Sequence, residues 1–543
     1  MNQVLLVVND HQERPAVRIH TLFALVLIWL GGISAPCPAA ETPDWYYREG
    51  PLRGSLKSDA PLPLYDSNPE HLWNRLFAVF YIRPSELPSR PEYPQDSTKL
   101  DEWDRKLRVG KLPPGPVVKR FDGGDTMGLL AWPRTRYYSE PGTFARAEKL
   151  LEEFITTHAE RLIDDPLKRA FLQRDLWAVF DHLAGQNIAR YGDGDLLRRG
   201  ALNRDVYGDE SDEVPFDDPE AIERRGILCR KLAVIIQRLA QPQAVIQALP
   251  DSYAAAIRSG HFTSQHDFDC QSNYLPAGLL TRPDEWVEID TSSESLPHLQ
   301  QEGQIDYVAW SIRGRSYYRI FWRFPGGRKA VEEYLKYIRE EGVDWEKTAR
   351  QGHVALKPDV RQIPAGTEAA IVQFMIVLDD RLVPVPTRLV ESLRVSVYKN
   401  VDGTPDPETN TGLGLIGRVY GAKRSLLFDN LKQGGLARVP DNAPTYQVLL
   451  AGHKDWGFWG RQQSVVQTCV HCHLHWKWKT GVFSLNSIFS FVPDGGMPGI
   501  VIPMGFGDIR TYPRSQRIAR WKQRQEDYLR LVEYARADDQ GDR

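Results

Sequence analysis

A chain of 543 residues is too long for one compact core, and its 42% hydrophobic and 26% charged residues are typical of folded globular proteins. Its 68 basic residues are balanced by 71 acidic ones, and the resulting net charge of −3 argues against a nucleic-acid-binding protein. We therefore expect a multidomain protein that binds no nucleic acid.

Residues 1–40 have the order of a secretory signal peptide. Arg14 and Arg18 precede an apolar run over 22–30, and small residues follow up to Ala39 and Ala40, where we expect cleavage. The apolar run is shorter than the roughly 20 residues that span a bilayer. The sequence thus predicts a periplasmic or otherwise exported protein, with no stable membrane insertion after signal removal. An uncleaved membrane anchor is the alternative interpretation.

The chain then changes from irregular to helical. Residues 41–141 are rich in proline and tryptophan, and we expect one helix there, over 68–81. Residues 142–260 carry apolar residues at helical spacing and are predicted to form a helical, bundle-like domain. Asp165-Pro166 and Asp218-Pro219 are helix-start signals, and Pro250 is expected to split the last helix.

Two features near this helical region bear on cysteine chemistry. Cys229 lies in a predicted helix and is interpreted as a buried thiol, with a disulfide to Cys270 as the alternative. Residues 261–270 hold two histidines, two aspartates and Cys270. Because their spacing matches no metal site that we can identify, we interpret this segment as a polar linker.

Residues 261–450 are predicted to form a central, antiparallel β-rich domain. The expected strands cover 285–290, 317–324, 369–378, 393–398 and 446–450, with one helix over 327–340. Tyr318, Ile320 and Trp322 alternate with Arg319, Phe321 and Arg323, which predicts a strand with one wetter face. The pair Asp379-Asp380 is interpreted as the solvated tip of a hairpin.

The most specific motif of the chain is Cys469-Val470-His471-Cys472-His473, the C-x-x-C-H pattern of covalent haem attachment. Its two thiols suit the two vinyl groups of a porphyrin, and His473 then falls where its imidazole can ligate the iron. At these residues the chain resembles the c-type cytochromes, over little more than residues 450–543. A Cys469–Cys472 disulfide is an alternative, and so is a zinc or copper site that includes nearby histidines, namely His471, His473 and His475.

This resemblance implies that residues 451–543 form a small helical, cytochrome c-like segment holding haem c, with a methionine as the second ligand of the iron. Met497, within Gly-Met-Pro, and Met504 are the candidates. Met497 follows His473 more closely than that family usually allows, and Met504 is somewhat better spaced. A helix over 515–537 would close the segment. Its basic residues are Arg517, Arg520, Lys522 and Arg524. They suit an acidic redox partner protein, although a solvated helix face is the simpler interpretation.

The resemblance implies an exported electron-transfer protein with one covalent haem. A haem-dependent, peroxidase-like oxidoreductase is the first alternative, because 543 residues is long for a simple electron carrier. A non-catalytic envelope protein with a C-x-x-C disulfide is the second. The sequence contains no G-x-S-x-G, H-E-x-x-H or phosphate-binding loop, so it identifies no catalytic residue.

Overall fold

The computed structural model describes most of the chain between residues 63 and 441 and a helical stretch near its end. The described ranges are 63–81, 83–88, 117–122, 125–127, 141–184, 219–290, 314–347, 357, 360–401, 406–412, 414–441, 444–445, 463–464, 499–500 and 513–541. The predicted signal peptide, the C-x-x-C-H motif, both candidate methionines and the predicted strand over 446–450 lie outside these ranges.

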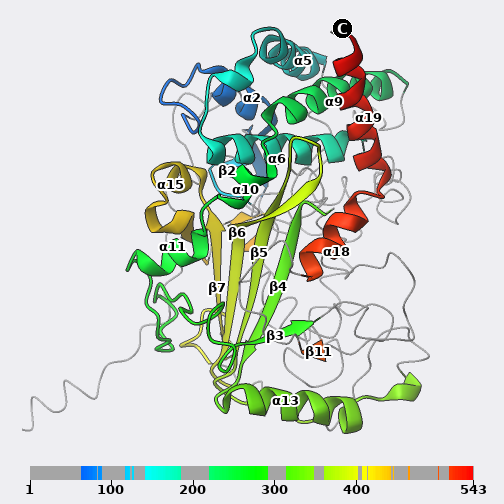
Figure 1. Ribbon diagram of the computed structural model, residues 1–543. Coiled ribbons are helices and arrows are strands. Elements are labelled where there is room, and N and C mark those ends of the chain that lie inside the picture. The colour runs from blue at the N-terminus through cyan, green and yellow to red at the C-terminus, as the bar shows by residue number, and fades with distance from the viewer. Residues whose placement is uncertain are drawn as a thin grey trace, which may run out of the picture.

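A seven-stranded antiparallel sheet is the largest element of the described residues, with the strand order β11-β3-β4-β5-β6-β7-β8 (Figure 1). Its strands are β3 (Val287–Asp290), β4 (Ser316–Arg323), β5 (Glu368–Leu378), β6 (Pro384–Tyr398), β7 (Leu415–Ala422), β8 (Leu436–Val439) and β11 (Gly499–Ile500). Two separate antiparallel pairs join β1 (Arg83–Pro88) to β2 (Val117–Asp122) and β9 (Pro444–Thr445) to β10 (Gln463–Ser464).

Helices gather at one end of this sheet (Figure 1). They are α2 (Leu72–Tyr81), α5 (Pro141–Thr156), α6 (Pro166–Ala184), α9 (Pro219–Leu239) and α19 (Glu526–Gly541). The remaining helices flank the sheet: α10 (Gln243–Gln247), α11 (Ser252–Arg258), α13 (Gly327–Tyr337), α15 (Arg424–Phe428) and α18 (Pro513–Lys522). Three short turns complete the set: η2 (Ala159–Arg161), η6 (Ile338–Gly342) and η7 (Lys432–Gly435). Within the described ranges, no helix combines the length and apolar character that a membrane crossing requires.

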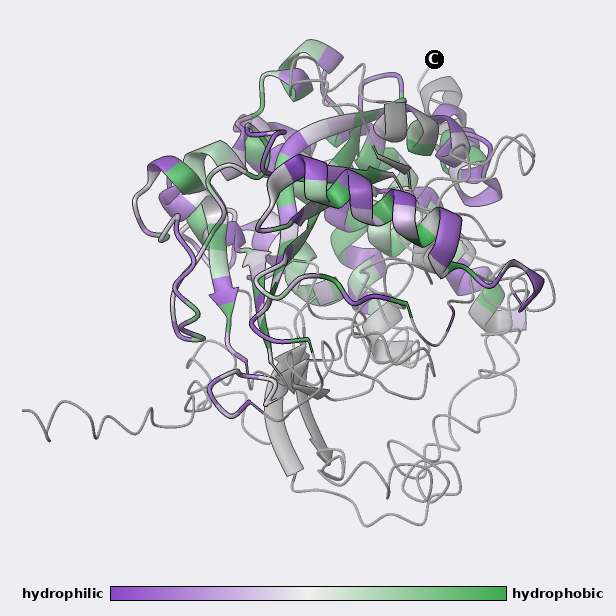
Figure 2. Ribbon diagram, turned by 90° about the horizontal axis from the view of Figure 1, so that it is seen from below, coloured by the Kyte–Doolittle hydropathy of each residue, from purple (hydrophilic) through white to green (hydrophobic). Residues whose placement is uncertain are grey.

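Helices and sheet share one hydrophobic core. Its buried side chains come from α2, α5, α6 and α9, from the central strands β5 and β6, and from the late helices α18 and α19. A second cluster lies between β3, β4 and α13 at the opposite end of the sheet. There α13 buries Val331 and Leu335 and leaves Glu333 exposed, and Figure 2 shows the hydrophilic residues on the outside of this end. The fold is therefore mixed α+β, with helices and sheet packed directly together.

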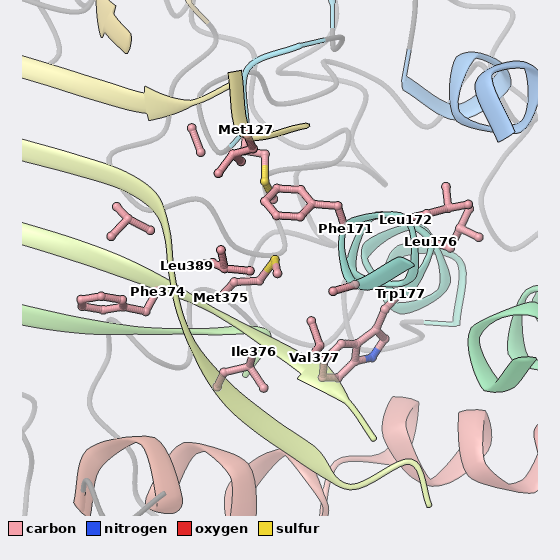
Figure 3. Close-up of a cluster of buried hydrophobic side chains, with 14 of the residues drawn as sticks. Met127, Phe171, Leu172, Leu176, Trp177, Phe374, Met375, Ile376, Val377 and Leu389 are labelled. Atoms are coloured by element: carbon pink, nitrogen blue, oxygen red, sulfur yellow. The ribbon is translucent and has the colours of Figure 1, made fainter. Parts of the chain in front are cut away.

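The helix at the centre of this core is α6. Asp165 accepts hydrogen bonds from the amides of Leu167 and Lys168 at 2.8 and 3.2 Å, and Pro166 occupies the first turn, so the helix begins where the sequence signal predicts. Figure 3 shows its apolar side chains pointing in different directions: Phe171 and Trp177 toward the sheet, Leu172 and Leu176 away from it. A helix that is covered on all sides must also bury its polar residues.

Each polar residue of α6 in the core has a partner on another element. Gln173 hydrogen-bonds both backbone groups of Leu378, at 2.9 Å each, and so extends the ladder of β5. Arg174 donates to Glu391 at 3.0 Å, where a register irregularity in β6 leaves Glu391 outside the regular pairing with β5. Asp181 binds the start of β4 and the end of α18, through Arg315 at 2.6 Å and Lys522 at 2.7 Å.

The most fully satisfied of these residues is Asp175. Its carboxylate accepts two hydrogen bonds from Arg424 of α15, at 2.6 and 3.0 Å, and one from Tyr65 at 3.1 Å. All three side chains are buried. A buried ion pair adds little net stability, because taking both charges out of water offsets most of their attraction. The main effect of this pair is therefore to hold α15 and residue 65 on α6.

Most predicted elements of the described ranges are present. The helix starts at Pro166 and Pro219 are confirmed, and so is the split at Pro250, which separates α10 from α11. The predicted hairpin between the strands near 370 and 395 is confirmed as β5–β6. The predicted helix over 515–537 is instead two helices, α18 and α19, separated by residues 523–525.

Three interpretations of charged residues need correction. Arg319 lies on β4, which is buried on both faces. Its charge is paired with that of Glu288 at 2.7 Å, which allows it to be buried. Asp379 is fully buried, and its carboxylate accepts the backbone amides of Arg381 and Val383 at 3.0 and 2.7 Å. Its neighbour Asp380 is exposed, so the predicted solvated tip is confirmed for Asp380 and wrong for Asp379. Lys522 is 0% exposed and pairs with Asp181, so it does not belong to a basic surface.

Substituting Asp175 is expected to destabilise the protein strongly. Asp175→Ala leaves the Arg424 guanidinium buried without its carboxylate, and the free energy of unfolding should fall by about 3–5 kcal/mol. Glu285→Ala is the matched control: it also removes a carboxylate partner of an arginine, Arg282, in an exposed pair, and should change the free energy by less than ~1 kcal/mol. Urea unfolding of both variants measures the difference, and equal losses would contradict the importance of the buried pair.

Candidate functional site

The residues predicted to hold a haem, Cys469, Cys472, His473, Met497 and Met504, all lie outside the described ranges. The structure does describe a short strand on each side of the first four of these residues. Before the motif, β10 pairs with β9, which follows β8 closely. After Met497, β11 pairs with β3 at the other edge of the sheet. Of these two strands, only β11 belongs to the seven-stranded sheet, because β9 and β10 form a separate pair.

A second candidate region is the loop over 261–275, here called the Cys270 loop, which lies between α11 and β3. The structure places this loop against β7 and β8, so it is no linker between separate units. Arg418 of β7 donates to Ser272 Oγ at 2.8 Å, and Arg438 of β8 donates to the carbonyl of Cys270 at 2.6 Å. Sequence reasoning missed both arginines, because nothing in their local pattern indicates that they bind a loop 146 and 168 residues earlier.

Internal hydrogen bonds fix the shape of the Cys270 loop. The backbone of Thr263 pairs with residues 273 and 275 at 3.0 and 2.9 Å, and the Asp269 carboxylate accepts the amide of Gln271 at 2.9 Å. The side chain of Tyr274 reaches across to Glu368 of β5 at 2.6 Å. The Cys270 loop therefore has a defined conformation and packs against the sheet.

His266 occupies an unusual position within the loop. Its Nδ1 accepts the amide of Phe268 at 2.8 Å, and its ring packs on Phe268 and Tyr274 with centroids 4.3 and 5.5 Å apart. Burial is the main cause that lowers the pKa of His266 from 6.5 to about 4, and the positive charge of Arg418 adds to it. His266 is therefore neutral at physiological pH, with the proton on Nε2.

The structure gives no support to a metal site in this loop. Nδ1 of His266 is used by a backbone amide, and Nε2 carries the proton, so neither nitrogen is ready to bind a metal. Among the described residues, no group of three or more histidine, cysteine or acidic side chains is placed to hold an ion.

The two cysteines of the described ranges differ in state. Cys229 on α9 is a free thiol, 2% exposed, and burial raises its pKa to about 12. Cys270 is 4% exposed and is disulfide-bonded. The predicted alternative of a Cys229–Cys270 disulfide is thus wrong, while the prediction of a buried thiol at Cys229 is confirmed. The physical reason is their placement: Cys229 packs among the helices, whereas Cys270 lies beside β8.

Comparison with known proteins adds no further assignment. No protein-family model, no curated protein and no solved structure matches this chain.

Protonation of His266 is expected to destabilise the folded protein in acid. The unfolded chain takes up a proton near pH 6.5 and the folded chain only near pH 4, so the stability that depends on neutral His266 is lost as the pH falls through this window. His266→Gln should therefore lose less stability than the wild type between pH 7 and pH 4.5. Urea unfolding at both pH values measures this, and parallel losses in the two proteins would argue against it.

Proposed function

We propose that this protein is an exported, c-type cytochrome-like protein that carries one covalent haem at Cys469, Cys472 and His473 and transfers electrons to or from a redox partner protein. The observation that carries the proposal is the C-x-x-C-H motif. A haem c held there would supply one-electron chemistry at iron. The two thiols would hold the porphyrin and His473 would ligate the iron.

The chemistry of the available donors fits this group. The motif offers two thiols and an imidazole within five residues, and two methionine thioethers, Met497 and Met504, follow it. A methionine ligand favours ferrous iron and raises the reduction potential.

One observation favours a second candidate. Cys270 is disulfide-bonded, and Cys229 is not its partner, so the disulfide draws on a cysteine outside the described ranges. If that cysteine belongs permanently to the motif, covalent haem attachment by two thioethers is prevented. The protein would then be a non-catalytic envelope protein stabilised by a disulfide.

Haem attachment is tested by expressing the full chain with a bacterial haem-attachment system and recording a pyridine haemochrome spectrum. The expected result is one covalent haem per chain in the wild type and none in the Cys469→Ala, Cys472→Ala double variant, because both thioethers are lost. Cys229→Ala is the control, since it removes a free cysteine that is buried on α9 and is no part of the motif. A wild-type protein without covalent haem would refute the proposal and leave the envelope protein.

The ligand opposite His473 is tested with Met497→Ala and Met504→Ala. The variant that loses the ligand is expected to have a lower midpoint potential and to bind carbon monoxide in its reduced form, whereas the other variant should resemble the wild type. Redox titration and absorption spectra measure both properties. Carbon monoxide binding by the reduced wild type would instead show an open iron position and favour the haem-dependent oxidoreductase.

A further inference from the structure

The hydroxyl groups of buried tyrosines differ in the chemistry of their acceptors. Tyr253 donates to the backbone carbonyl of Pro276 at 2.5 Å, and a carbonyl is too weak a base to take up the proton. Tyr274 of the Cys270 loop instead donates to Oε2 of Glu368 on β5 at 2.6 Å, the length of a charge-assisted hydrogen bond. Tyr274 therefore has a proton acceptor within direct reach.

The Tyr274–Glu368 pair is enclosed by the fold. Each of the two residues is 1% exposed. Oε1 of Glu368 accepts a hydrogen bond from Arg323, its neighbour on β4, and the side chain of Arg323 is 35% exposed, so the cation is in contact with solvent. Burial and the negative charge of Glu368 raise the pKa of Tyr274, so the phenol keeps its proton at physiological pH.

The Tyr65–Asp175 pair near α6 also joins a phenol to a carboxylate, but it is less suited to proton transfer. The hydrogen bond is longer, 3.1 Å, and both oxygens of Asp175 also accept hydrogen bonds from Arg424. A carboxylate that a buried guanidinium holds through both oxygens is a weaker base. Tyr274 thus has the better proton acceptor of the two tyrosines.

A line of rings leads from Tyr274 to the protein surface. The centroid of its ring lies 5.5 Å from that of His266, which lies 4.3 Å from that of Phe268. Phe268 is 43% exposed. An oxidant at the surface is therefore separated from Tyr274 by the rings of His266 and Phe268, a short path for electron tunnelling.

We propose that Tyr274 is a redox-active tyrosine, which gives one electron to a strong one-electron oxidant at the surface, such as an oxidised metal complex, while its phenolic proton moves to Glu368. The O–H bond of Tyr274 breaks, an O–H bond forms at Oε2 of Glu368, and the oxidant is reduced by one electron. The products are a neutral tyrosyl radical and a neutral carboxylic acid, and a one-electron reductant reverses the step. No residue of the C-x-x-C-H motif takes part, so this activity goes beyond the proposed function and does not depend on it.

The carboxylate matters because a phenol becomes a strong acid when it loses an electron. An oxidised phenol that kept its proton would carry an unpaired positive charge in the core, which is costly. Transfer of the proton along the existing hydrogen bond to Glu368 avoids this charge. Arg323 then loses its counter-charge, and its partly exposed side chain tolerates the loss.

Photo-oxidation of the full chain tests the proposal. The oxidant is tris(bipyridine)ruthenium(III), generated by light and persulfate, and samples frozen at intervals are examined by electron paramagnetic resonance. The expected result is a tyrosyl signal that persists longer than those of exposed tyrosines and couples to a proton that exchanges in deuterated water, namely the proton that Glu368 has taken up. A wild-type protein with no persistent tyrosyl signal, or with one that lacks an exchangeable proton, would overturn the proposal.

Variants assign the signal to a residue. Tyr274→Phe should abolish it, whereas Tyr253→Phe, the matched control, removes a buried tyrosine that has no carboxylate partner and should retain it. Glu368→Gln should lose most of the signal, because a carboxamide oxygen does not take up the proton. Near-UV circular dichroism checks that each variant is folded. An unchanged signal in folded Tyr274→Phe or Glu368→Gln would refute the proposal, and the exchangeable proton of the wild type decides the matter if Glu368→Gln does not fold.

Discussion

Burial of the polar side of α6 is the constraint on which the rest of the fold depends. A helix that is covered on every side must offer each polar group a partner, because an unpaired group in the core costs as much as several favourable contacts gain. The partners of Gln173, Arg174, Asp175 and Asp181 come from β5, β6, α15, the start of β4 and α18. One helix thereby fixes the relative positions of sheet, flanking helices and late helices.

The same constraint explains why the helical and β-rich parts of the sequence share a core. Their apolar stripes and alternating strands were visible in the sequence as separate patterns, and each pattern is locally correct. The packing that unites them depends on pairs such as Asp175 with Arg424, which are 249 residues apart. Local periodicity carries no information on such pairs, so the sequence predicts the elements better than it predicts their arrangement.

The errors of sequence reasoning have the same origin. Lys522 and Asp379 were assigned to solvent because charged residues usually lie there, yet each has a specific buried partner that only the fold supplies. The candidate haem motif, in contrast, is a local pattern and needs no fold to be recognised; it stays a prediction, because its residues lie outside the described ranges. The disulfide state of Cys270 is the opposite case, since only the structure separates it from Cys229.

The contribution of α18 and α19 to the core has a consequence for the timing of folding. Ile518 and Leu531 are buried in the main hydrophobic cluster, and Lys522 supplies positive charge to the carboxylate of Asp181. These residues follow the C-x-x-C-H motif in the chain and are synthesised after it. Until they dock, Asp181 lacks one of its two cationic partners and the core stays incomplete. The core of the described residues is thus completed only by the last helices of the chain, after the whole stretch that precedes α18 has been synthesised.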